Sequence, residues 1–437
     1  MSSEPQAVTS TVAEVPLSRR FGLIWWIALV VSGAFVLLLG YTLVSVTILG
    51  VGVWGVNIPF VWGFDLINYA WWIGIANGAS LFAAILVLRR HDLRTSVNRF
   101  AEGVALFAVI CAGIFPIFHL GRPWLFYWTF PYPATFQVWP QFRSTLTWDF
   151  WAISTHAIVT SLLWYVGLIP DLATLRDRAR SKTAKRLYGV FALGWRGSVR
   201  HWAYHQRAYR LVAILVLPLI LIMQSTVAFE FAVTLVPDWH ETRQPLHFVA
   251  TGLAQGLSIV LLVAVLLRWG LRLGHYIDEE DVDLLGKLVL ASALVSGYLY
   301  LDEIASALLA GGLAQDATFK RITGDYAGLY WTAIVYSILI PQLFWLKAAR
   351  QSTIAGIFVG VSIGTGIWFD RYSIIVGGLQ TDYLPSISRT YSPTLPETGL
   401  FLGTVGLFAA LLLLFVRFLP VVSMFEIRHD EHEENSS

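Results

Sequence analysis

Ten long apolar stretches run through this chain of 437 residues, and they constrain its fold more than any other feature. The hydrocarbon core of a bilayer is about 30 Å thick, so a helix needs about 20 apolar residues to cross it. We therefore expect an all-α membrane protein with about ten transmembrane helices. The expected spans are residues 21–49, 66–88, 100–118, 148–169, 208–236, 246–267, 284–311, 326–346, 351–369 and 398–416.

The composition supports this interpretation and excludes an ordinary soluble domain. Hydrophobic residues make up 56% of the chain, charged residues only 13%, and 19 residues are tryptophans. Polar residues 1–20 precede the first span without a small-residue cleavage site, so we interpret that span as a retained helix and not as a signal peptide. The net charge of +2 gives no reason to expect nucleic-acid binding.

The distribution of positive charge predicts the orientation in the membrane. When ten spans are threaded, 23 of the 30 lysines and arginines fall on the side that also carries both termini. The longest basic loop, residues 176–207, lies on that side. The positive-inside rule therefore places both termini in the cytoplasm.

Cysteine and histidine usage gives no sign of a bound cofactor. The single cysteine, Cys111, cannot ligate an iron–sulfur cluster alone, form an internal disulfide or attach a haem. His201 and His205 have helical spacing but no third ligand nearby, and only His156 lies well inside a span. We expect neither a metal nor a covalent cofactor in this chain.

Acidic residues near the membrane are the first functional candidates, because charges inside a bilayer are costly. Most of them fall at the outer ends of the expected helices, whereas the inner half has few, with Glu102 near its edge. Asp65 could simply cap the second helix, and Asp370 could be only an ion-pair partner of Arg371. The outer acids are Asp65, Asp149, Glu230, Asp302, Glu303 and Asp370.

A histidine and a carboxylate are expected to meet at the outer boundary. The third span runs outward and ends at His119, while the fourth begins near Asp149 and runs inward, so both lie at one depth below an aromatic loop. His156 lies about 10 Å deeper on the face that carries Asp149. Arg122 could tune both groups or anchor the loop to lipid headgroups.

This pair suits the oxidation of a quinol, which releases two protons with two electrons. The unperturbed pKa of histidine is near working pH, and desolvation moves that of a carboxylate toward it. We therefore predict that a quinol ring binds between His119 and Asp149. A possible proton relay comprises His156, Glu230, Asp302, Glu303, Asp370, Arg371, Tyr298 and Tyr300, and any continuation to the cytoplasm would use water, hydroxyls, Asn or Gln.

Several segments resemble the NrfD/PsrC family of membrane quinone-interacting subunits. The similarity is dense in "DLINYAWWIGIANGAS" and "FPIFHLGRPWLFYW", and it resumes at "PDWH" and "FDRYSIIV". Within the family, the sequence is most similar to the ActC type of bacterial alternative complex III. Asn77 departs from the pattern, because the family usually has histidine there.

The resemblance implies two four-helix bundles with two flanking helices. The corresponding divisions are a tail at 1–20, the first helix and outer loop at 21–65, the first bundle at 66–236, the second at 246–370, and an outer loop, last helix and tail at 371–437. It places a menaquinol or ubiquinol pocket at His119 and Asp149 in a bacterial cytoplasmic membrane. It also implies an iron–sulfur subunit on the outer face, haem c subunits and a paralogous membrane subunit, besides lipids.

Two alternatives remain open from the sequence. The chain could anchor a molybdenum reductase of the polysulfide type, in the same family but working in the opposite direction. It could also be a proton-coupled secondary transporter, since transporters commonly combine similar helical bundles with buried acids. Competitive binding of a quinol analogue would separate the transporter from the other two.

Overall fold

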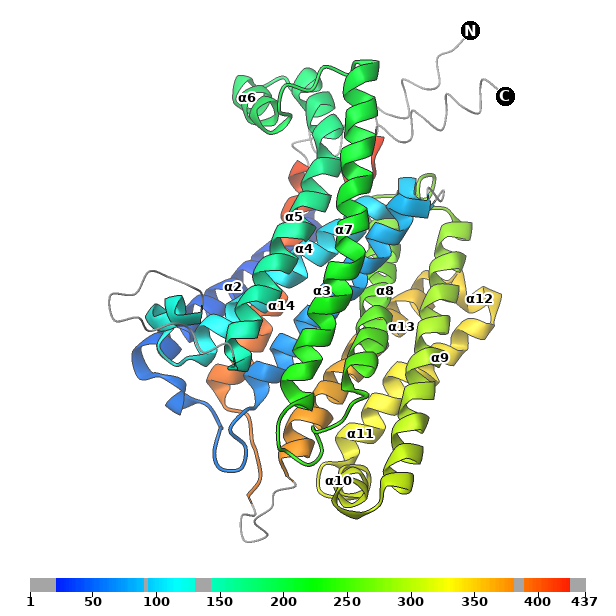
Figure 1. Cartoon of the computed structure of the whole chain (residues 1–437). Coiled ribbons are helices and arrows are strands. Elements are labelled where there is room, and N and C mark those ends of the chain that lie inside the picture. Colours follow the sequence, from blue (N-terminus) through cyan, green and yellow to red (C-terminus); the bar gives the residue numbers. More distant parts are fainter. Residues whose placement is uncertain (1–20, 90–92, 130–142, 381–388, 425–437) are drawn as a thin grey trace.

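Ten helices of the computed structural model are long and apolar enough to cross a membrane, which confirms the expected number and fold class. The structure describes residues 21–89, 93–129, 143–380 and 389–424, and this part of the chain contains no β-strand. Figure 1 shows the helices packed side by side along a common direction. They are α2 (Leu23–Leu49), α3 (Phe64–Arg89), α4 (Leu93–His119), α5 (Thr145–Arg178), α7 (Val199–Ala232), α8 (Gln244–Gly270), α9 (Glu279–Ala310), α11 (Ala327–Ile334, continued irregularly to Trp345), α13 (Thr353–Tyr372) and α14 (Leu395–Phe418).

Several helices extend well beyond the apolar stretches that predicted them. Helices α5 and α7 have 34 residues each, so each is about 50 Å long at 1.5 Å per residue. Hydropathy identifies only the apolar part of a helix. The backbone hydrogen bonds of the helix continue beyond that part, into turns that carry Arg and Lys. Two short helices outside the predicted spans, α6 (Lys182–Phe191) and α10 (Gly312–Thr323), lie at opposite ends of the molecule (Figure 1).

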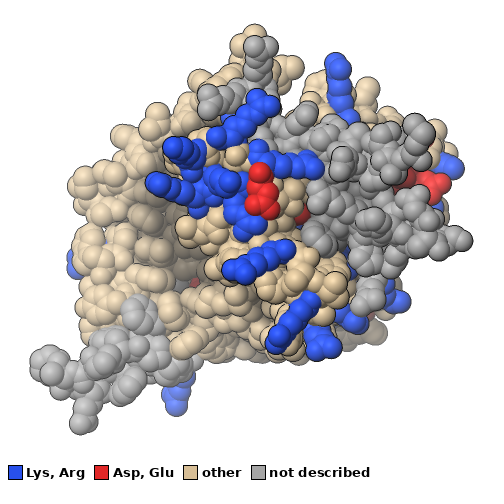
Figure 2. Space-filling model, turned by 90° about the horizontal axis from the view of Figure 1, so that it is seen from above, with Lys and Arg blue, Asp and Glu red and all other residues tan. Residues whose placement is uncertain are grey.

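Positive charge gathers at one end of the helices. We call this the basic end; α2 begins there, α14 ends there, and it carries α6. Figure 2 looks onto this end and shows Lys and Arg side chains clustered on it, with few acidic ones visible. We call the other end, which carries α10, the opposite end.

Helix α3 lies at the centre of the fold and crosses α8 at very short range. It packs against α4, α7 and α8. A Cβ atom added at Gly256 would lie 2.3 Å from the backbone nitrogen of Ala79, and one at Gly78 would lie 2.1 Å from the Gly252 carbonyl oxygen. Spacings of four residues between small side chains allow such backbone contact in membranes. These glycines therefore bring the first and second halves of the chain together.

We expect the substitution Gly256→Ala to destabilise the protein by about 1–3 kcal/mol, because the added methyl group would force α3 and α8 apart. The matched control is Gly33→Ala, since nothing lies within 4 Å of a Cβ atom there. The control should be neutral or slightly stabilising because alanine favours helix. Thermal unfolding in detergent measures both, and equal midpoints for the two variants would show that the α3–α8 contact tolerates a methyl group.

Candidate functional site

His119 is held at the opposite end by a carboxylate from a different helix than expected. It is the last residue of α4, and its Nδ1 lies 3.0 Å from an oxygen of Asp65, in the first turn of α3. Both side chains are buried. Asp149, the predicted partner, interacts with His119 electrostatically within the same cluster. Asp65 thus faces the His119 imidazole directly, a role that the interpretation as a helix cap missed.

Aromatic rings enclose the His119 imidazole. The ring centroids of Trp62, Tyr69, Phe115 and Trp54 lie 5.6, 6.1, 6.4 and 6.5 Å from it. The Nε2 atom is buried and has no hydrogen-bond partner among the described residues. A buried nitrogen without a partner is costly, so this atom is suited to a polar group of a ligand.

Asp149 lies in the same cluster and contacts two further helices. The Tyr69 hydroxyl of α3 donates a hydrogen bond to its Oδ1, and Glu230 of α7 shares a second hydrogen bond with it. Two buried carboxyl groups in contact need a proton between them. From the sequence we listed Glu230 in one possible relay with Asp302, Glu303 and Asp370, and the structure places it beside Asp149.

Polar side chains continue from this cluster into the middle of the bundle. His156 Nε2 lies 3.2 Å from the Ser80 hydroxyl, which lies 3.2 Å from that of Thr160. Nearby, Asn77 donates a hydrogen bond to Gln224, whose own amide donates to the Phe248 carbonyl oxygen at 2.8 Å. Hydroxyl and amide groups thus occupy the depth where the sequence led us to expect them, and their role as a relay stays a prediction.

A second buried polar cluster lies among α4, α5 and α7, nearer the basic end. Glu102 is fully buried and accepts hydrogen bonds from Tyr209 and Asn98. Arg99 pairs with Asp171 at 3.0 Å and lies 3.7 Å from Glu102. We expected few acids here because the predicted third span began at residue 100, whereas α4 begins at Leu93 and surrounds Glu102 with further turns.

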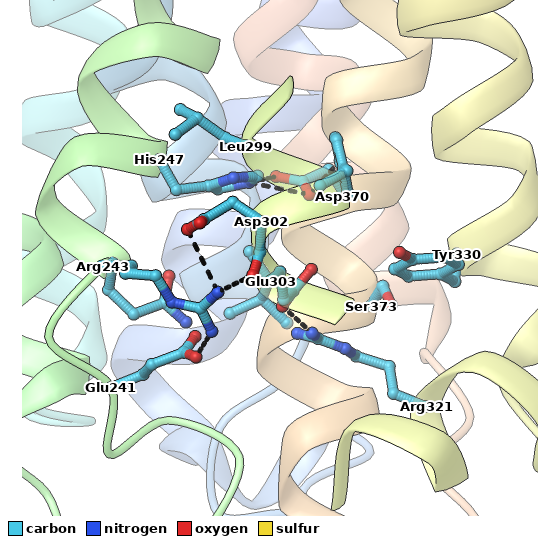
Figure 3. Close-up of a pocket in the computed structure, with 13 residues that line it drawn as sticks. Glu241, Arg243, His247, Leu299, Asp302, Glu303, Arg321, Tyr330, Asp370 and Ser373 are labelled. Atoms are coloured by element: carbon cyan, nitrogen blue, oxygen red, sulfur yellow. Dashed lines mark hydrogen bonds and ion pairs between the residues drawn. The ribbon is translucent and has the colours of Figure 1, made fainter. Parts of the chain in front are cut away.

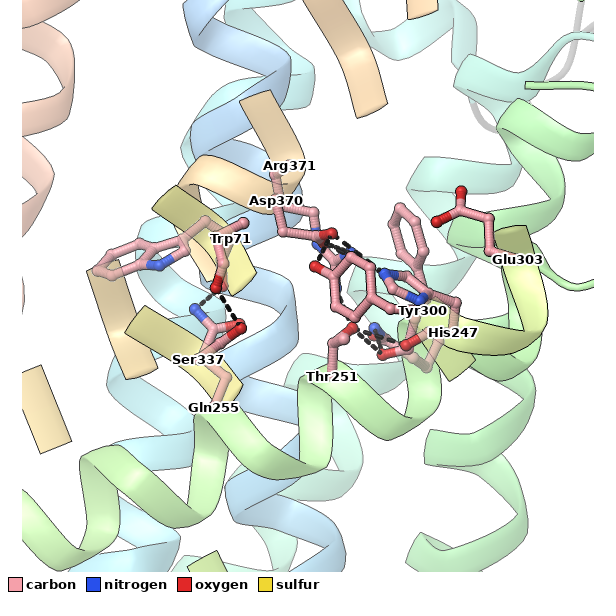
Figure 4. Close-up of polar contacts among 12 residues, drawn as sticks. Trp71, His247, Thr251, Gln255, Tyr300, Glu303, Ser337, Asp370 and Arg371 are labelled. Atoms are coloured by element: carbon pink, nitrogen blue, oxygen red, sulfur yellow. Dashed lines mark hydrogen bonds and ion pairs between the residues drawn. The ribbon is translucent and has the colours of Figure 1, made fainter. Parts of the chain in front are cut away.

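The second half of the chain carries its own buried network, centred on Asp370 (Figure 4). Asp370 accepts from Tyr300 and lies 2.7 Å from Arg371 and 3.2 Å from His247 Nε2. The Arg371 guanidinium also donates to Thr251 at 2.7 Å and lies 3.8 Å from the centre of the Phe248 ring. A π-helical segment, Ser373–Gly377, follows directly, and such segments are common at functional sites.

Two arginines hold the adjacent acids at the outer edge of this network (Figure 3). Arg321 pairs with Glu303 and lies 3.4 Å from Asp238, while Arg243 contacts Asp302 at 3.3 Å. A cavity of about 20 Å³ between these groups has room for about one water molecule. Tyr298 lies outside the network, because 66% of it is exposed, and Arg122 is exposed as well.

Apart from Arg371, the basic partners of these acids were not predicted from the sequence. The contacting residues are far apart in the sequence. The separation is 123 residues for His247 and Asp370, 59 for Arg243 and Asp302, and 18 for Arg321 and Glu303. The sequence did contain one signal for them. A basic side chain near an expected span needs an opposite charge nearby, just as an acidic side chain does. Among the described residues, no group of three or more His, Cys, Asp or Glu side chains is arranged to hold a metal ion.

Arg321 is expected to stabilise the loop between α7 and α8 in a pH-dependent way. Burial raises the pKa of Asp238; the Arg321 charge opposes this rise, and Glu303 adds to it. In Arg321→Gln the pKa of Asp238 should rise further, so stability falls as the pH increases toward that pKa. We expect a loss of about 1–3 kcal/mol at pH 8 and a smaller loss at pH 5, where protonated Asp238 needs no cation.

Thermal unfolding in detergent at the two pH values measures this effect. Lys320→Gln is the control, since Lys320 is exposed and donates only to the Gln380 carbonyl oxygen among the described residues. It should change stability little at either pH. A loss in Arg321→Gln that is independent of pH would contradict the electrostatic explanation.

The fold and these buried networks define the chain as an integral multi-pass membrane protein with acid–histidine clusters in both halves. Residues 52–382 match the family model described as "Polysulphide reductase, NrfD". The chain therefore belongs to the NrfD family, whose members are membrane subunits of oxidoreductase complexes. It is also similar to a putative membrane subunit of dimethyl sulfoxide reductase from Halobacterium salinarum, with 22% identity over 86% of this chain and 89% of that protein.

Proposed function

We propose that this chain is the quinol-oxidising membrane subunit of a respiratory or photosynthetic electron-transfer complex of the alternative complex III type. The observation that carries the proposal is the buried, unpartnered Nε2 of His119 inside its aromatic enclosure, as seen among the described residues. Tyr69, one of the enclosing rings, donates a hydrogen bond to Asp149 in the same cluster. A menaquinol or ubiquinol ring could place one hydroxyl at His119 and the other at Asp149.

In the proposed reaction, the quinol loses two electrons and two protons and becomes a quinone. His119 Nε2 accepts one hydroxyl proton, and the Asp149 carboxylate accepts the other. Hydrogen bonds to Tyr69 and Glu230 hold Asp149 in place for this step. Asp65 balances the charge of the protonated imidazole. The protons then leave at the opposite end, and the electrons pass to an iron–sulfur subunit docked there.

The wider assembly follows from the same proposal. Haem c subunits and a paralogous NrfD-like membrane subunit would accompany the iron–sulfur subunit. The basic end would face the cytoplasm of a bacterial cell, with both termini on that side, as the cluster of Lys and Arg in Figure 2 supports. Proton translocation through Asp370 and its partners is a further part of the proposal, and release of more than two protons per quinol in vesicles would test it.

A second candidate is supported by the similarity to the putative dimethyl sulfoxide reductase protein of Halobacterium salinarum. In that case quinol would be oxidised at the same cluster, and its electrons would pass to a molybdenum enzyme. The proteins that co-purify with the chain distinguish the two candidates. Haem c subunits would favour the first, and a subunit with a molybdenum cofactor the second.

Quinone binding to the intact complex tests the proposal directly. A short-tailed naphthoquinone or benzoquinone bound beside Trp62 and Trp54 should quench part of the tryptophan fluorescence. Trp62→Phe should reduce the amplitude of this quenching, whereas Trp345→Phe should not, because Trp345 is 64% exposed and lies on the continuation of α11 in the other half of the chain. Saturable quenching that is identical in the two variants would place the quinone elsewhere.

A further inference from the structure

A large apolar groove opens near the basic end, far from the His119 cluster. Its volume is about 910 Å³, and it lies between α2 and α14 on one side and α8 on the other. Trp25 and Ala28 of α2, Ala409 and Leu413 of α14, and Val263 and Trp269 of α8 line it. The Trp25 indole donates to the Leu413 carbonyl oxygen at 3.3 Å, which fixes that wall.

Two arginines lie at the end of the groove nearest the basic end. Arg272 lines the groove, is exposed and has no ion-pair partner among the described residues. The Arg417 guanidinium lies 4.9 Å from the centre of the Phe21 ring, which also lines the groove. The groove is therefore apolar along its length and positively charged where α8 and α14 end.

This distribution matches the chemistry of one class of ligand. Acyl chains fill apolar surfaces between transmembrane helices, and basic groups at the cytoplasmic ends of such helices attract anionic headgroups. Among the described lining residues, only Ser32 and Arg272 have polar or charged side chains. A water-soluble ligand would therefore find almost no hydrogen-bond partner along the walls. Trp25, near the start of α2, and Trp269, near the end of α8, suit the interface between acyl chains and headgroups.

We propose that this groove is a binding site for an anionic phospholipid of the leaflet at the basic end. The acyl chains lie between α2, α14 and α8, and the phosphate lies at Arg272. Since α2 contacts mainly α14, the lipid fills the space that separates this helix pair from α8. The bound lipid thus becomes a structural link between the first helix and the second half of the chain.

Native mass spectrometry of the purified complex in mild detergent, with added phosphatidylglycerol or phosphatidylcholine, tests the proposal. We expect the wild type to retain phosphatidylglycerol in preference to phosphatidylcholine. Arg272→Gln should weaken retention of phosphatidylglycerol about fivefold, as expected for one basic group at a lipid headgroup. Ala409→Trp, which fills the groove, should abolish the tightly retained lipid.

The control is Arg186→Gln on α6, an exposed arginine at the same end of the molecule but outside the groove. Its lipid retention should equal that of the wild type. Equal retention of both lipids, an unchanged result in Ala409→Trp, or retention of a quinone in place of phospholipid would each overturn the proposal. Lipid binding that appears only after removal of residues 1–18 would also overturn it, since the chain's own terminus would then occupy the groove.

Discussion

The substitution Asp149→Asn is expected to slow quinol oxidation by about 10²–10⁴-fold, the usual contribution of a positioned acid or base. An asparagine keeps the size of the side chain and can still accept the Tyr69 hydrogen bond, so the complex should assemble normally. It cannot accept a proton from the quinol, and it no longer shares a proton with Glu230. The rate should therefore fall at every pH in the range where the complex is stable.

The assay is quinol oxidation by the purified complex with an artificial electron acceptor, with the amounts of the partner subunits checked in parallel. Asp177→Asn is the control, because Asp177 lies on the same helix near the basic end and its side chain is 64% exposed. It should leave the rate unchanged. Normal turnover in Asp149→Asn would remove this residue from the reaction, and a loss of partner subunits would point to a structural role instead.

The transmembrane helices were well predicted from the sequence because hydropathy depends on local composition alone. The sequence also placed His119 and Asp149 at one depth, since both flank the loop between adjacent antiparallel helices. Their direct partners were harder to predict. Whether Asp65 or Asp149 faces His119 depends on how α3, α4 and α5 are rotated about their axes, and a sequence pattern does not contain that rotation.

Glu230 and the second network illustrate the same difficulty. Glu230 lies near the end of α7, and only the packing of α7 against α3 and α5 brings it to Asp149 instead of Asp302. His247 meets Asp370 across 123 residues of sequence. The depth of Glu230 and of Asp370 was predictable, whereas their contacts with Asp149 and His247 were not, because groups at one depth lie on helices that neighbour each other only in the folded protein.

The Asp370–Arg371 pair has the largest expected effect on stability. Arg371 is fully buried, and its described contacts are Asp370, Thr251 and the face of the Phe248 ring. Thr251 and Phe248 are neutral, so among these groups only Asp370 balances the charge. Removing one member of a buried ion pair leaves the other uncompensated and typically costs about 3–5 kcal/mol.

Asp370→Asn should therefore destabilise the protein by about 3–5 kcal/mol, whereas the double variant Asp370→Asn/Arg371→Met should recover most of that loss. Thermal unfolding in detergent measures both, with Asp177→Asn as the exposed control, for which a change of at most about 1 kcal/mol is expected. If the double variant were as unstable as the single one, the cost would come from lost packing and hydrogen bonds around Tyr300 and His247. A stable but proton-transfer-deficient double variant would instead show that the pair is kept in the membrane for function, because the fold does not need it.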